Sequence, residues 1–324
     1  MRSTIEWRLV PRKRLWLAAQ IVFFAVAVWY FGIQVSGNWG ELNSLVGTLH
    51  PNWWRIAESG VWVFLSYAVL IETWRQTVIA WGARLGWGAA TRIWFISNLG
   101  KYIPGKVWQI GAMGALAQEA GVSGVAAVGS SLVVNLVNLL AACLVVMLAG
   151  SRQLAGPAFT LGIITFFFAV AAAPWLLPPL ARVVQRISGR EIPEPRIPPL
   201  AIVLAIVGCA LAWNLYGIAF RELAVALFGA PAGLTSAYTA VFTLSYLMGY
   251  LAIFAPGGIG VRESVLTTLL VSTGLASGAG AVTLVVVSRL WLTLLEASPG
   301  LILLALRHSR SSHHSTFTNG PQTG

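Results

Sequence analysis

The sequence predicts an all-α membrane protein, a polytopic bundle of transmembrane helices. Of its 324 residues, 57% are hydrophobic and only 10% are charged, whereas a soluble domain carries about 25% charged residues. The apolar residues form long uncharged blocks such as 15–35 and 122–150. A helix needs ~20 apolar residues to cross the hydrocarbon layer. Its backbone groups must be paired internally because no water reaches them there.

The apolar blocks predict about eight crossings. They are 15–35, 53–74, 122–149, 158–180, 199–220, 236–255, 259–275 and 279–306. Together they make one transmembrane domain at 15–306, which follows a basic tail at 1–14 and precedes a disordered tail at 307–324. The run 181–198 contains several prolines and reads as an extended cytoplasmic linker between two halves.

The distribution of Lys and Arg predicts the orientation of the chain. These residues gather in the two tails, in 75–92 and in 181–198. Since cytoplasmic loops carry the excess of Lys and Arg, both termini are predicted in the cytoplasm, with the chain in the inner (plasma) membrane. Residues 93–121 must then enter and leave on one side, as a re-entrant segment does. The net charge of +11 indicates contact with anionic lipid headgroups rather than with nucleic acid.

A first broken-helix motif lies at 98–108. Pro104 removes a backbone donor and Gly105 permits left-handed dihedrals, so the pair interrupts a helix in apolar surroundings. Lys101 and Lys106 flank the break. A helix that begins after it would present free N–H groups to an anion. The alternative is a plain interfacial loop with two solvated lysines.

A second motif of the same kind lies at 254–263. It combines a broken helix with a cation and an anion, in the order Pro256, Gly257, Gly258, Gly260, Arg262 and Glu263. Its glycines allow a tight turn and close approach to a ligand; the alternative is a tight turn between two crossings. Pro104 and Pro256 are 152 residues apart, close to half the length. Paired broken helices indicate an internal pseudo-repeat of the kind found in transporters.

Polar residues inside the predicted crossings form a third group. Arg289 and Glu296 are seven residues apart and so share one helix face. Ionisable groups are costly in hydrocarbon, so we expect them to form a pair that faces the bundle interior. Three amide side chains would line a polar cavity or, alternatively, bond neighbouring helices: Asn135, Asn138 and Asn214.

The sequence lacks the residues that several kinds of catalytic and metal site require. The chain has no aspartate, none of its four histidines lies in a predicted crossing, and its two cysteines lie in apolar blocks. Histidine nucleophiles, paired aspartate–metal sites and metal clusters are therefore not expected. General acid–base work would fall to glutamate alone. We expect a protein that is not an enzyme and that needs no cofactor.

The two motifs carry a family resemblance. The runs 100–108 and 255–263, together with 117–121 around Glu119, resemble the lysylphosphatidylglycerol synthase transmembrane family, which includes the flippase domain of the multiple peptide resistance factor. The resemblance implies a membrane domain that translocates, or helps to process, phospholipids or polyprenyl-linked lipids. The large aminoacyl-transferase domain of the full synthase is not in this sequence, so we expect a standalone member, and the resemblance does not imply lysyl-transfer activity.

These observations predict a lipid flippase whose partners are membrane lipids. A lipid phosphate would meet four cations in a cavity: Lys101, Lys106, Arg262 and Arg289. Glu263 and Glu296 would balance those charges or hold a cationic headgroup. Two alternatives stay open. One is a non-catalytic membrane partner of a separate lipid- or glycan-modifying transferase, and the other is an intramembrane enzyme that uses glutamate.

Overall fold

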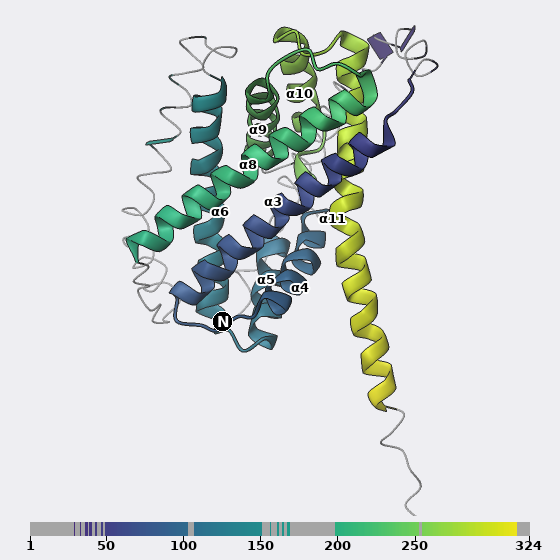
Figure 1. Ribbon diagram of the computed structural model, residues 1–324. Helices are drawn as coiled ribbons and strands as arrows, with labels where there is room; N and C mark the ends of the chain where they lie inside the picture. The colour runs from purple at the N-terminus through teal and green to yellow at the C-terminus, as the bar shows by residue number, and fades with distance from the viewer. Residues whose placement is uncertain are drawn as a thin grey trace, which may run out of the picture. The chain divides into compact units, whose positions relative to one another are not determined.

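The computed structural model describes residues 49–102, 107–150, 198–252 and 255–315, with isolated positions between 29 and 47 and between 156 and 168. That part of the chain holds eight α-helices and no strand, which confirms the all-α fold class (Figure 1). The α-helices are α3 (Trp53–Ala80), α4 (Trp87–Asn98), α5 (Val107–Glu119), α6 (Gly124–Gly150), α8 (Pro199–Phe228), α9 (Thr235–Leu251), α10 (Val261–Ser272) and α11 (Gly278–Ser315). Two short 3-10 helices, η2 (Leu99–Tyr102) and η3 (Pro256–Gly258), complete it.

Four helices are long and apolar enough to cross a membrane. These stretches are Trp53–Ala80, Ala126–Gly150, Pro199–Phe228 and Gly278–Leu306. They correspond to the predicted crossings that begin at 53, 122, 199 and 279. α11 itself continues to Ser315, into the tail expected to be disordered. The predicted crossings 15–35 and 158–180 and the linker 181–198 lie almost wholly outside the described residues.

The remaining four helices form two hairpins of short helices. α4 and α5 contact each other and have 12 and 13 residues. At ~1.5 Å per residue they are ~18–20 Å long, too short to cross a layer ~30 Å thick, as a re-entrant segment requires. α9 and α10 also contact each other and have 17 and 12 residues. The expectation that 259–275 crosses by itself is wrong, because α10 is only ~18 Å long.

The order of the elements supports the internal repeat. Each half of the chain reads long helix, short helix, short helix, long helix: α3 to α6, then α8 to α11. The proline-glycine pair falls between the two short helices both times. α3 and α8 begin 146 residues apart, and α6 and α11 begin 154 residues apart. These spacings agree with the 152 residues between Pro104 and Pro256.

The chain divides into two compact units, which are described separately. Unit 1 comprises Met1–Trp62, Ala141–Ala169 and Trp213–Arg289, and unit 2 comprises Val63–Leu140, Val170–Ala212 and Leu290–Gly324.

Small and polar residues join α3 to α8 in unit 1. Asn52, just before α3, donates its backbone N–H to the carbonyl of Ala226 at 2.9 Å. The Ser59 hydroxyl donates to the carbonyl of Ala219 at 2.8 Å. The contacts step by seven residues along each helix in opposite directions, so the helices pack antiparallel and side by side (Figure 1). Apolar side chains gain little by leaving lipid for another helix, so helices in a membrane associate through close packing and hydrogen bonds. Small residues on both helices allow the backbones to approach closely enough for these contacts.

The same helices meet in the same way in unit 2. The Ser66 hydroxyl, seven residues after Ser59, donates to the carbonyl of Ala212 at 3.0 Å. Further along, a Cβ on Gly208 would lie 2.3 Å from the hydroxyl oxygen of Thr73. The residues with hydroxyl groups on α3 are thus seven apart, at Ser59, Ser66 and Thr73. Each of them faces an alanine or a glycine of α8.

Candidate functional site

The turn that precedes α10 in unit 1 requires glycine. Gly257, Gly258 and Gly260 have positive φ angles of 58°, 70° and 84°. Side chains with a Cβ rarely adopt this conformation. A Cβ on Gly258 would also lie 2.9 Å from the carbonyl oxygen of Gly249 in α9. The glycines therefore allow the turn to pack directly against the backbone of α9.

The N-terminus of α10 is capped by its own carboxylate. Glu263 Oε2 accepts a hydrogen bond of 2.6 Å from the backbone N–H of Gly260, the N-cap residue. This is the glutamate half of a capping box. The negative charge also complements the positive end of the helix dipole. One backbone N–H group at the start of α10 is therefore already bonded to Glu263.

Arg289 of α11 ties the turn and α10 together. Its Nη2 donates to the carbonyl oxygen of Gly257 at 3.1 Å, and its Nε lies 3.4 Å from Glu263 Oε1. The side chain of Glu263 is only 9% exposed and that of Arg289 is 20% exposed. Arg289 therefore forms an ion pair with Glu263, and its expected pairing with Glu296 stays a prediction. Glu296 is buried two turns further along α11, in unit 2.

Arg262 is buried against aromatic rings of α9. Its guanidinium carbon lies 3.8 Å from the ring centroid of Tyr246 and 5.1 Å from that of Phe242. The residue is 4% exposed. A cation over a ring face within about 6 Å is attracted by the electrons of the ring. The rings therefore offset part of the free-energy cost of burying this charge.

The aromatic cluster was not predicted from the sequence. Tyr238, Phe242 and Tyr246 recur every fourth residue on α9, and so share one helix face. They contact rings of α8: Phe220 with Tyr238 and Phe242, Tyr216 with Phe242, and Trp213 with Tyr246. The numbering runs in opposite directions, so α8 and α9 are antiparallel. The four-residue spacing of aromatic residues was the signal that could have predicted this face.

The ring beneath Arg262 supports a testable expectation. Replacing Tyr246 with leucine removes the cation–π contact, and we expect a loss of about 2 kcal/mol in the free energy of unfolding. Tyr246→Phe keeps the ring and should lose much less. Thermal unfolding of both variants in one detergent measures the difference. Equal losses in the two variants would show that the ring does not stabilise the cation.

The other predicted site residues take varied positions. Lys101 lies in η2, whereas Pro104, Gly105 and Lys106 lie outside the described residues. On α6, in unit 2, Asn138 is half-buried and the Asn135 amide donates to the carbonyl of Ser131 at 2.8 Å. That bond is local to the helix. Asn214 is exposed on α8.

Three side chains thus form one charged site in unit 1: Arg262, Glu263 and Arg289. Their formal charges sum to +1 within a predominantly apolar unit. Burying ions is costly unless they are paired, and the capped helix, the ion pair and the stacked ring each offset part of that cost. We refer to these three residues as the arginine–glutamate site. It can accept an anion through the N–H donors of the partly exposed Arg289.

The helices and this site define a polytopic membrane protein that holds buried charge beside a glycine-rich turn. The family model described as lysylphosphatidylglycerol synthase TM region matches residues 17–297. The chain therefore belongs to that family, and its function concerns membrane lipids. No curated protein matches the chain.

Proposed function

We propose that this protein is a lipid flippase that binds a phosphate-bearing headgroup at the arginine–glutamate site. The observation that carries the proposal is the composition of this site, in which the partly exposed Arg289 and the buried Arg262 carry two positive charges and Glu263 carries one negative charge. A phospholipid or polyprenyl-linked lipid brings a phosphate that neutralises this excess. Arginine suits the role because its planar fork matches the oxygens of a phosphate.

In this proposal each residue of the site has a distinct role. Arg289 is the more accessible of the two arginines and makes the first contact with the phosphate. Arg262, held on Tyr246, supplies the second positive charge. Glu263 fixes Arg289 in place and lowers the formal charge of the empty site from +2 to +1. The acyl chains remain in the bilayer while the headgroup crosses.

The remaining predictions belong to the same proposal. The proposal also keeps six residues that the sequence predicts to bind the headgroup or to line a polar cavity: Lys101, Lys106, Glu296, Asn135, Asn138 and Asn214. The protein resides in the inner membrane with both termini in the cytoplasm, because Lys and Arg gather in the tails, 75–92 and 181–198. It carries out no bond-making step of its own.

Reconstitution into liposomes tests the proposal. A fluorescent headgroup-labelled phospholipid, or a labelled polyprenyl phosphate, is bleached from outside, and the loss beyond half reports translocation. We expect Arg262→Gln to reduce the rate at least tenfold, since one charge-assisted contact is worth about 1.5 kcal/mol or more. Arg262→Lys should retain part of the rate because it keeps the charge. Arg84→Gln is the control, since Arg84 is exposed between α3 and α4.

Two results would overturn the proposal. One is wild-type protein that moves none of the labelled lipids. The other is translocation that is equally fast with and without the charge at position 262. Co-purification with a transferase, and loss of its product in a strain whose lipid translocation is normal, would favour the non-catalytic partner instead.

A further inference from the structure

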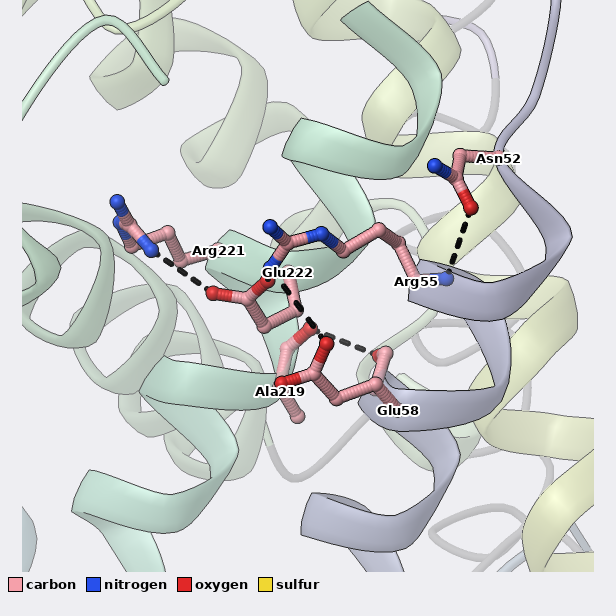
Figure 2. A network of polar contacts seen from close by, with 7 residues as sticks. Asn52, Arg55, Glu58, Ala219, Arg221 and Glu222 are labelled. Atoms are coloured by element: carbon pink, nitrogen blue, oxygen red, sulfur yellow. Dashed lines mark hydrogen bonds and ion pairs between the residues drawn. The ribbon is translucent and has the colours of Figure 1, made fainter. Parts of the chain in front are cut away.

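A second charged cluster lies in unit 1, where α3 begins and α8 approaches its end (Figure 2). Arg55 Nη1 lies 2.6 Å from Glu222 Oε2, and Arg221 Nη1 lies 2.8 Å from Glu222 Oε1. Each oxygen of this carboxylate therefore meets a different arginine. Glu58 is a weaker fourth member, with 3.5 Å between its Oε2 and Arg55 Nη1. The side chain of Glu222 is 7% exposed, so it lies beneath the two guanidinium groups.

The cluster has more donors than acceptors. Each guanidinium carries five N–H donors and each carboxylate two oxygens. Arg221 Nε is buried and has no hydrogen-bond partner among the residues that the structure describes. Buried donors in a purely structural network are normally satisfied. The spare donors indicate that an acceptor with several oxygens comes from outside the chain.

An external ligand can reach these donors. The side chain of Arg55 is 42% exposed and that of Arg221 is 27% exposed. Next to Arg55, Trp53 and Trp54 are 76% and 79% exposed, as aromatic residues are at the membrane–water interface. The lipid phosphates lie at that level. The position therefore favours the phosphate of a lipid headgroup.

The cluster and the arginine–glutamate site lie at different levels of the antiparallel pair α8–α9. Phe220, adjacent to Arg221, packs against Tyr238, whereas Arg262 stacks on Tyr246. Tyr238 and Tyr246 are eight residues apart, ~12 Å along the helix. A charged headgroup that crosses ~30 Å of hydrocarbon would need more than one binding site with groups of opposite charge.

We propose that Arg55 and Arg221 form a second binding site for a phosphodiester, the phosphate of a lipid headgroup, with Glu222 holding both guanidinium groups in place. The identity of the ligand as a lipid rests on the proposed function. Fastening α3 to α8 does not by itself account for the cluster, because Ser59 and Asn52 already bond α8 at Ala219 and Ala226.

Lipid retention by the full chain in nanodiscs tests this site. Native mass spectrometry counts retained phosphatidylglycerol for wild type, Arg55→Gln, Arg221→Lys and the control Arg84→Gln. We expect Arg55→Gln to lower retention about tenfold, the effect of one charge-assisted hydrogen bond. Arg221→Lys keeps the charge but loses the fork, and should also lower retention. Arg84→Gln should leave it unchanged. Retention should also fall with added salt.

A competitor and two further measurements, of stability and of translocation, distinguish the possible interpretations. Inorganic phosphate is added as a competitor, and displacement of the lipid at equal concentration would assign the site to soluble phosphate and overturn the lipid proposal. Unchanged retention in Arg55→Gln and Arg221→Lys, with a lower unfolding temperature, would show a structural cluster only. If these variants lose retention while wild type translocates nothing, this site stands and the flippase proposal fails. If both variants bind and translocate normally, the flippase stands and this site fails.

Discussion

Replacing Arg289 with glutamine is expected to lower the free energy of unfolding by about 3–5 kcal/mol, because it leaves the buried carboxylate of Glu263 without its counter-ion. The variant also loses the donor that holds the carbonyl of Gly257, so the glycine turn loosens. Thermal unfolding in a mild detergent measures the effect as a fall in the unfolding temperature. Under the proposed function translocation should be lost as well, because one of the two cations proposed to bind the phosphate is gone.

A double variant separates stability from function. Glu263→Gln combined with Arg289→Gln removes both charges, and the new amide oxygen at position 263 can still accept the hydrogen bond from Gly260. We expect it to recover most of the lost stability, since neither ion of the Arg289–Glu263 pair is left without the other, but none of the translocation. A double variant as unstable as Arg289→Gln would mean that the ion pair is not the cause. A stable double variant that translocates normally would remove the arginine–glutamate site from the mechanism.

Replacing Gly217 with alanine should cost about 3 kcal/mol in the free energy of unfolding, at the upper end for an overpacked core. The added Cβ would lie 1.9 Å from the hydroxyl oxygen of Thr239 and 2.6 Å from its backbone α-carbon. Because the backbone cannot rotate away as a side chain can, α8 and α9 must separate. The aromatic contacts between the two helices, and with them the support of Arg262, should weaken.

Three comparisons make this prediction specific. Adding Thr239→Ala should not restore Gly217→Ala, because the clash with the backbone of residue 239 remains. At Gly208 the described neighbours within reach are all side-chain atoms of Thr73, the nearest being its hydroxyl at 2.3 Å. Thr73→Ala should therefore restore most of the loss in Gly208→Ala. Gly111→Ala in α5, where no described atom lies within 4 Å, should be neutral or stabilising by up to about 1 kcal/mol. Full rescue by Thr239→Ala would contradict the clash with the backbone.

Much of the site's local structure was already visible in the sequence. The run of proline and glycine before Arg262 predicted a broken helix, and the structure has three glycines with positive φ there. Helical spacing predicted Glu296 as the partner of Arg289 and did not single out Glu263. Glu263 is 26 residues away along the chain, and only the packing of α10 against α11 brings it within 3.4 Å. The second cluster was missed because Arg55 and Glu222 are 167 residues apart.

Hydrophobic composition by itself determined that this protein is a helical membrane protein. In lipid the backbone N–H and C=O groups must be paired within the protein, and a long uninterrupted apolar block achieves this by forming a helix. The sequence also determined where the helices break, since proline and glycine act on the local backbone. Only the tertiary structure decided which charged side chains pair with each other. It also decided that 259–275 contains one of the two short helices of a hairpin. Those outcomes depend on contacts between helices that are distant in the chain, and local patterns carry no information about such contacts.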